Sequence, residues 1–174
     1  EDRRDPRKGV LVRGHCEGSY ESLGSETAYE RAEASMDLYG TLRKKHTIRF
    51  HGYWGTSRGD VPFYKYFNQG HPATFIGMAY DQLQGNAMKI ARADYSYRHT
   101  TWVQFKLMAN VALDLNERRP DITYSPGALW GAGAGVVVNT PLGLLEFSYG
   151  LGSKSPSDPD TLQSVVYLQL GALF

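Results

Sequence analysis

Residues 101–115 read TWVQFKLMANVALDL, and they decide the fold class because their side chains alternate in character along the whole stretch. One set of alternate positions is apolar throughout: Val103, Phe105, Leu107, Ala109, Val111, Leu113 and Leu115. The other set is mostly polar: Gln104, Lys106, Met108, Asn110, Ala112 and Asp114. A period of two puts the sets on opposite faces of a β-strand. The stretch is much longer than a globular strand of about five or six residues, and it suits a tilted strand that crosses a bilayer.

The same alternation recurs in seven other segments, which are 9–20, 31–38, 47–54, 88–99, 130–138, 145–149 and 166–174. Eight strands is an even number, as a closed up-and-down barrel requires. A soluble β-sandwich or lipocalin-like barrel also has alternating strands, but it would turn its charged face outward and its apolar face inward. The sequence therefore predicts an all-β fold, an antiparallel transmembrane β-barrel of eight strands or the C-terminal half of a sixteen-stranded barrel.

Composition limits the alternatives. The 174 residues suit one domain, which we take as 1–174. No run approaches the roughly eighteen apolar residues of a transmembrane helix, and the mean hydropathy of -0.43 fits strands whose two faces average out. A single Cys excludes an internal disulfide, and a net charge of +1 gives no basis for a nucleic-acid partner. The first residues lack the apolar core of a signal peptide, so we expect a mature chain or a piece of a longer one.

Connection lengths also alternate along the chain. The connections at 43–45, 99–100 and 139–143 are short, whereas those at 22–25, 56–85, 116–127 and 152–162 are mostly longer. Short periplasmic turns and long extracellular loops are typical of outer-membrane barrels. We therefore expect a bacterial outer-membrane location, with both termini periplasmic and a long extracellular loop at 57–85.

Four motifs occur in order along nearly the whole chain: the strand entry at 5–9, the stretch from 61–70 to 75–78, the Thr-Pro-Leu-Gly hairpin at 139–145, and the closing segment 168–174. Together they resemble the superfamily of BamA, TamA and the two-partner secretion transporters, and most of all the barrel of patatin-like outer-membrane proteins. The second resembles the inward-folded sixth extracellular loop of the family, with Phe75, Ile76, Gly77 and Met78 at its tip. In the last, the resemblance implies that Gly171, Ala172 and Phe174 form the signal that the outer-membrane assembly machinery reads.

Two positions depart from the family pattern. The loop tip usually has Arg before Gly and an aromatic residue after it, where this chain has Ile76 and Met78. The strand that receives this Arg usually carries Asp-x-Gly, and here residues 108–110 read Met-Ala-Asn. Both partners of a buried ion pair are thus replaced together, which leaves no unpaired charge in the lumen. The departure argues against the insertase or translocase activity that the resemblance implies, because that activity is associated with the ion pair. It does not argue against the barrel fold.

Charged residues are expected to line the lumen. We assign to the inner face Arg13, Arg31, Arg49, Lys89, Arg92, Arg98 and Lys106, facing Glu17, Glu33, Asp37, Asp94, Asp114 and Glu146. In an eight-stranded barrel these pairs would plug the lumen, whereas in half of a sixteen-stranded barrel they would line a wide, wet cavity. The row Gly131, Gly133 and Gly135 is best explained by strand curvature or by room for a bulky lumenal group.

No constellation of catalytic residues is evident, so we expect no enzyme, no cofactor and no metal site. The expected function is membrane anchoring, with export or display of a partner or upstream domain. A stand-alone accessory barrel in a larger outer-membrane complex is the second hypothesis, and a lipid-modifying enzyme is the third. The expected partners are outer-membrane lipid and lipopolysaccharide, the outer-membrane assembly machinery, and a second copy or a larger membrane complex.

Overall fold

The computed structural model describes residues 8–116, 128–141, 143–155 and 158–172 of the chain. Eight long antiparallel strands form one sheet, in the order β1-β2-β3-β6-β7-β8-β9-β10. They are β1 (Gly9–Ser19), β2 (Tyr29–Leu42), β3 (His46–Gly59), β6 (Ala87–Arg98), β7 (Val103–Asn116), β8 (Leu129–Thr140), β9 (Gly143–Ser155) and β10 (Asp158–Ala172). The all-β prediction and its eight strands are confirmed.

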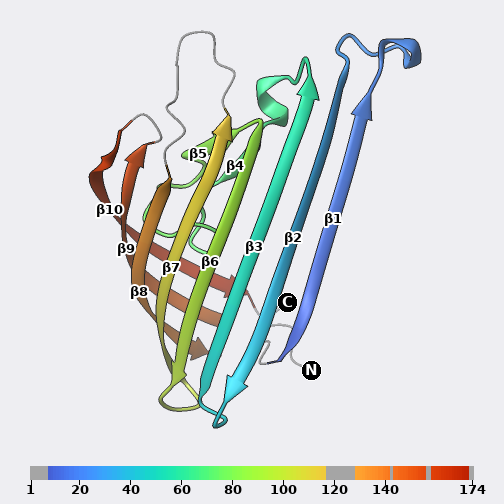
Figure 1. Ribbon diagram of the computed structural model, residues 1–174. Helices are drawn as coiled ribbons and strands as arrows, with labels where there is room; N and C mark the ends of the chain where they lie inside the picture. Colours follow the sequence, from blue (N-terminus) through green and yellow to red (C-terminus); the bar gives the residue numbers. More distant parts are fainter. Residues whose placement is uncertain (1–7, 117–127, 142, 156–157, 173–174) are drawn as a thin grey trace.

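The sheet curves into a trough, and it is not closed (Figure 1). Neighbouring strands pair one after another, and β1 and β10 are its two edges. Strands of 11 to 15 residues are long enough to cross a bilayer, since a tilted strand needs roughly 9–11 residues. The open sheet agrees with the expected half of a larger barrel and differs from a closed eight-stranded one.

Short and long connections lie at opposite ends of the trough (Figure 1). The turns after β2, β6 and β8 are short, and β1 begins and β10 ends at the same end as these turns. At the other end lie the 3-10 helix η1 (Glu21–Leu23) and the long connection from β3 to β6. The long connection expected at 152–162 is wrong, because β9 and β10 extend through most of it and pair across an irregular register between Asp158 and Leu162.

The connection between β3 and β6 turns back into the trough. It contains the 3-10 helix η2 (Phe63–Lys65) and a two-stranded sheet of β4 (Phe67–Gln69) and β5 (Leu83–Gly85). Its apolar side chains pack on the inner face of the main sheet in a core of Phe67, Phe75, Met78, Leu83, Met88, Ile90, Ala112 and Leu129. Within the described residues, no helix has the length and apolarity needed to cross a bilayer.

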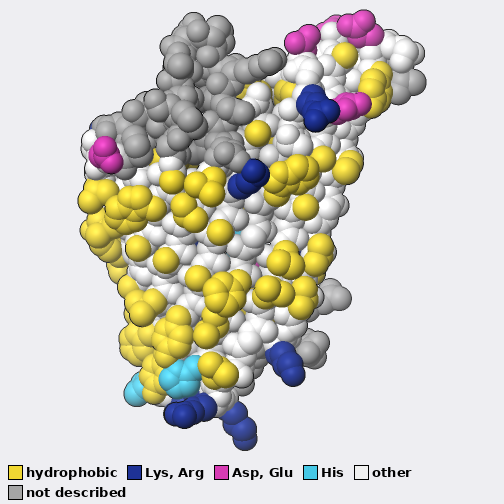
Figure 2. All heavy atoms as spheres, in the orientation of Figure 1, with side chains coloured by type: hydrophobic (Ala, Val, Ile, Leu, Met, Phe, Trp, Pro, Cys, Tyr) yellow, Lys and Arg dark blue, Asp and Glu magenta, His cyan; other side chains and the backbone are white. Residues whose placement is uncertain are grey.

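The outer face of the sheet is apolar, and its side chains are exposed (Figure 2). Examples are Val12 at 66%, Leu107 at 58% and Leu168 at 71% relative exposure. Exposed aromatic side chains accompany the apolar ones at six positions: Tyr20, Trp54, Tyr95, Trp130, Phe147 and Tyr149. Along the strands, most charged residues occupy the alternate positions that point to the inner face, so the two-face pattern of 101–115 extends over the sheet.

Candidate functional site: the seat of the inward-folded loop

The tip of the long loop is buried against the inner wall of the sheet. Phe75, Ile76 and Met78 are each 0% exposed, and Gly77 is buried between them. Surface loops normally keep their polar backbone in water, so a buried loop must find protein partners for its N–H and C=O groups. We use the term loop seat for the inner-wall residues that supply these partners or make room for the tip: Asn110, Gly131, Gly133, Gly150, Gly152, Gln163 and Tyr167.

Asn110 on β7 binds both main-chain groups of Ile76. The Ile76 N–H donates to the Asn110 side-chain oxygen at 2.8 Å, and the Asn110 amide nitrogen donates to the Ile76 carbonyl at 3.4 Å. The Ile76 side chain packs with Met108 and Tyr167, both nearly fully buried. Where the family resemblance implies an Arg and an acidic partner, this chain therefore has an amide that binds backbone and an aliphatic side chain in an apolar pocket.

Tyr167 and Gln163 on β10 bind the next two residues of the loop. The Gly77 N–H donates to the Tyr167 hydroxyl at 2.9 Å, and the hydroxyl donates to the Met78 carbonyl at 2.5 Å. The Gln163 amide donates to the Gly77 carbonyl at 3.1 Å. Together with Asn110, these side chains satisfy consecutive backbone groups over three residues of the loop.

Glycines on β8 and β9 let the loop backbone approach the wall. A Cβ atom at Gly131 would lie 1.9 Å from the Ile76 carbonyl oxygen, and one at Gly150 would lie 2.7 Å from the Gly77 nitrogen. Gly77 has φ +91°, and a Cβ atom there would lie 2.6 Å from the Leu151 oxygen, so this position favours glycine twice over. In the glycine row of β8, Gly131 and Gly133 make room for Ile76 of the loop, whereas a Cβ atom at Gly135 would lie 2.6 Å from the Ser148 hydroxyl on β9.

A layer of charged side chains between the loop seat and the short turns, the ionic layer, binds the loop at Pro72 and Ala73. Arg92 donates to the Pro72 carbonyl at 2.6 Å, and Arg49 donates to the Ala73 carbonyl at 3.1 Å. Arg49 also bonds to Asp37 at 2.7 Å and to Asp94 at 3.2 Å, and Arg92 bonds to Asp94 at 2.7 Å. Because Asp37, Arg92 and Asp94 are at most 7% exposed, each needs these partners to offset its loss of hydration.

The structure places most of the other expected lumenal charges on the same inner face. Glu17 bonds to Lys65 at 2.5 Å and lies 3.8 Å from Arg31, which is 3.4 Å from Glu33. Further pairs on this face are His51–Asp37 at 2.9 Å, Lys106–Glu146 at 2.6 Å and Arg13–Asp37 at 3.6 Å, where the Arg13 side chain is 64% exposed near the open edge.

Lys89 is a correction. It is exposed and pairs in register with Trp54 on the outer face, because it shares the parity of Ala91 and Ala93 rather than that of Arg92. The side chain of Asp114 and the whole of Phe174 lie outside the described residues. Gly171 is exposed near the end of β10, and Ala172 is its last residue.

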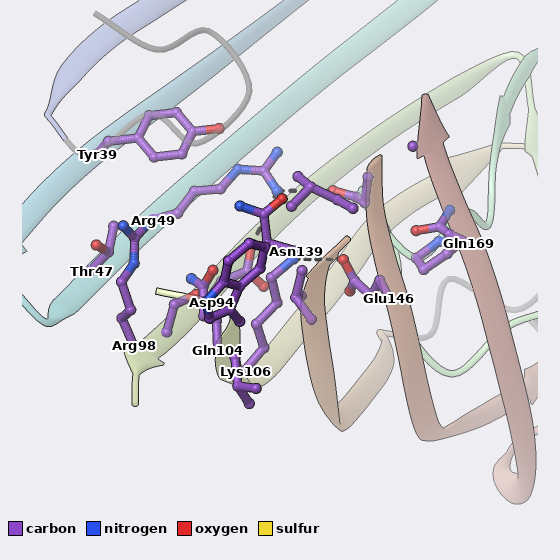
Figure 3. A pocket seen from close by; sticks show the side chains of 18 of the residues that line it. Tyr39, Thr47, Arg49, Asp94, Arg98, Gln104, Lys106, Asn139, Glu146 and Gln169 are labelled. Carbon is purple, nitrogen blue, oxygen red and sulfur yellow. Dashed lines mark hydrogen bonds and ion pairs between the residues drawn. The ribbon is translucent and has the colours of Figure 1, made fainter. Parts of the chain in front are cut away.

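A cavity of about 590 Å³ lies between the loop and the short turns (Figure 3). Pro72 and Ala73 of the loop border it on one side and Thr100 to Gln104 on the other. Charged side chains line its wall: Arg49, Arg92, Asp94, Arg98, Lys106 and Glu146. On β6 to β9 the inner face is thus divided along the strands into an apolar and glycine-rich part that holds the loop, and a polar part that borders the cavity.

Two groups of the loop have shifted pKa values. Burial lowers the pKa of His71 below its usual value, and the charge of Arg92 lowers it further, against smaller opposing effects of Asp81 and Glu146. The hydrogen bond to Glu17 raises the pKa of Lys65, so this lysine stays charged near the start of the loop. His71 also accepts a hydrogen bond from the Ala73 N–H at 3.1 Å, which helps to shape the turn that leads into the seat.

The sequence motifs predict the loop tip and point to residues 108–110, but they do not predict Tyr167, Gln163 or the apolar part of the inner wall. A signal existed for the apolar part, since Met88 and Ile90 share the parity of Arg92. Tyr167 and Gln163 gave no such signal, because their hydrogen bonds to the loop span 86 to 90 residues of sequence.

Comparison with known proteins agrees with this geometry. The family model described as "Omp85 superfamily domain" matches residues 1–174. The fold is similar to the crystal structure of BamA from Haemophilus ducreyi lacking POTRA domains 1-3, with a TM-score of 0.72, 18% identity, and 94% of this chain covered. The match covers 39% of that BamA chain, so the present chain spans well under half of its length. No curated protein matches in sequence. The chain belongs to the Omp85 superfamily of outer-membrane β-barrel proteins.

Proposed function

We propose that this chain is the membrane-embedded module of a protein that anchors a partner or an adjoining domain in the outer membrane and exports or displays it. The proposal places the apolar outer face in lipid, the short turns and both termini in the periplasm, and the long loops outside the cell. Its partners are outer-membrane lipid, lipopolysaccharide and the assembly machinery, and the chain itself has no enzymatic role.

The observation that carries the proposal is the loop seat. An open diffusion channel would need the space that residues 70–82 occupy, and here the backbone at the tip of this segment, 76–78, is bound by Asn110, Gln163 and Tyr167. A lumen that is filled from within suits a module that holds the bilayer closed and lets a polypeptide pass only when the loop is released. The Omp85 family match and the BamA-like fold support the same class of function.

The two edges of the sheet bear on the form of the complete barrel. A stand-alone eight-stranded barrel requires β1 to pair with β10, and in the described sheet these strands are opposite edges. Unpaired edge strands expose hydrogen-bonding groups that lipid cannot satisfy. We therefore propose that further strands, from the same protein or from a second copy, complete the barrel.

Heat-modifiable electrophoresis and surface labelling of the full-length protein in a Gram-negative host test the proposal. The folded protein should migrate faster before boiling than after it. An epitope inserted at η1 should be labelled on intact cells, whereas the same epitope inserted at 43–45 should be labelled only after lysis. A protein that stays folded and monomeric in buffer without detergent would refute the membrane assignment.

A further inference from the structure

The turn between β2 and β3 carries three consecutive basic residues at the end of the trough. Arg43, Lys44 and Lys45 are all exposed, and Arg43 and Lys44 have positive φ values of 49° and 61° in this tight turn. The Lys45 carbonyl accepts a hydrogen bond from the Arg98 N–H at 2.8 Å, which fixes the turn to the neighbouring strand β6. Figure 2 shows Lys and Arg side chains projecting from the lower end of the molecule.

No acidic residue offsets this charge at the same end of the described strands. The three short connections with their flanking residues, 40–48, 96–105 and 138–145, contain neither Asp nor Glu. Of the exposed acidic residues in the described chain, Glu21, Glu26 and Asp60 lie in connections at the opposite end, and Glu30 and Asp160 lie in β2 and β10 at that end. The remaining one, Asp81, lies in the loop that turns back into the trough. Within the described residues, the short turns therefore form a basic rim without exposed acidic neighbours.

A row of rings lies on the outer face next to the basic turn. The His46 ring lies 5.1 Å from Tyr97, Tyr97 lies 6.3 Å from His99, and His99 lies 6.3 Å from Phe105, measured between centroids. The His46 Nδ1 atom is also 2.6 Å from the hydroxyl of Tyr95. The row crosses β3, β6 and β7, and rings with a polar group favour the headgroup level of a bilayer. It therefore sets the basic turn at the level of lipid phosphates.

We propose that this basic rim, formed by Arg43, Lys44, Lys45 and the adjacent His46, binds the phosphate groups of anionic phospholipids in the membrane leaflet that faces the short turns. The inference rests on the proposed function, because it takes the outer face to lie in lipid. A lipid fits this surface better than an acidic peptide does, because the charges continue directly into the apolar face that the acyl chains of the same molecule would cover. Each Lys or Arg close to an anionic bilayer strengthens the attraction by about fivefold.

Quenching of a tryptophan by brominated lipid tests the proposal. Leu42 is 60% exposed and directly precedes the turn, so Leu42→Trp places a fluorescent reporter beside the rim. The emission of this reporter is obtained by subtracting the tryptophan emission of the parent protein from that of the variant. The full-length protein is reconstituted in phosphatidylcholine vesicles that contain a minor fraction of phosphatidylglycerol, with the bromine on one lipid or the other. Brominated phosphatidylglycerol should quench the reporter several-fold more than its share of the lipid predicts, and high salt should remove the excess.

Charge variants assign the effect to the turn. Replacing Arg43, Lys44 and Lys45 by Gln should bring the quenching down to the bulk proportion of phosphatidylglycerol, whereas Lys154→Gln, at the opposite end, should leave it unchanged. Single Gln substitutions, checked by heat-modifiable migration, serve if the triple variant does not fold. Equal quenching by both brominated lipids would overturn the inference and leave the membrane assignment standing. A reporter that neither lipid quenches would overturn the membrane assignment itself.

Discussion

Gly131→Ala should release the loop while leaving the sheet intact. The added Cβ atom would lie 1.9 Å from the Ile76 carbonyl oxygen and 2.8 Å from the Asn110 amide nitrogen, and the nearest atoms all belong to the loop or to Asn110. Close carbon–oxygen contacts have separations of about 3.3–3.6 Å, so the carbonyl must move away by about 1.4 Å or more. That movement breaks the paired hydrogen bonds between Asn110 and Ile76.

The expected loss can be worked out from those two bonds. Each contributes about 0.5–1.5 kcal/mol, so docking of the loop should weaken by about 1–3 kcal/mol. Alanine is otherwise at least as favourable as glycine in a strand, so the stability of the sheet should not fall with it. Gly52→Ala on β3 is the matched control, because a Cβ atom there meets nothing within 4 Å.

Amide hydrogen exchange of the folded protein measures the effect directly, because the Ile76 and Gly77 N–H groups are bonded to the seat. Their protection should fall by about 5- to 150-fold in Gly131→Ala and stay at the parent level in Gly52→Ala. Strand amides of β7 and β8 should keep their protection in both variants. Unchanged protection at Ile76 and Gly77 in Gly131→Ala would refute the assignment of the loop seat.

Three further predictions concern the seat and the ionic layer. Tyr167→Phe leaves the buried Gly77 N–H and Met78 carbonyl without their partner and should raise exchange at Gly77 by an amount equivalent to about 1–3 kcal/mol, whereas Tyr149→Phe on the outer face should not. Arg49→Met removes the closest cation from the buried Asp37, which keeps His51 at 2.9 Å and Arg13 at 3.6 Å. It should therefore lower unfolding stability in urea titrations by less than the roughly 3–5 kcal/mol of a fully unpaired buried charge, and adding Asp37→Asn should recover part of the loss. The pKa of His71 is lowered from 6.5 in the docked loop, so the released loop binds a proton more tightly than the docked loop does. Docking should therefore be strongest above about pH 6.5 and weaken as the pH falls through the lowered pKa. His71→Gln should abolish this pH dependence of hydrogen exchange in the loop.

The sequence predicted the strands and their two faces well, because the alternation of apolar and polar residues directly records which face meets lipid. It underestimated strand length where the alternation weakens: 145–149 became β9, Gly143–Ser155, whose outer positions continue to Leu151. The prediction for Lys89 was wrong because it assigned a charged residue to the inner face on the basis of its charge alone. A lysine near the end of a strand can instead keep its ammonium group hydrated while it lies on the outer face.

The site was only partly predictable. The motif at 75–78 located the loop tip, and the position of Asn110 was suggested by the departure from the family pattern. The sequence could not show that the Asn110 amide binds the main-chain groups of Ile76 at the place where the family pattern has an ion pair. Any residue offers the same main-chain N–H and C=O groups, so the identity of residue 76 does not reveal these hydrogen bonds. Tyr167 and Gly131 belong to the same seat through contacts that only the curved sheet creates.

The most direct measurement of the central claim compares two neighbouring residues on opposite faces of β7. Leu107 is 58% exposed on the outer face, whereas Lys106 points inward and bonds to Glu146 at 2.6 Å. Leu107→Arg should impair insertion into vesicles by about 2–4 kcal/mol if the residue lies at the midplane and by less toward the rim. Lys106→Glu should disturb the inner pairing and leave insertion intact. Equal effects of the two substitutions on insertion would contradict the assignment of the faces, and with it the account of this chain as a membrane-spanning sheet with a loop bound inside.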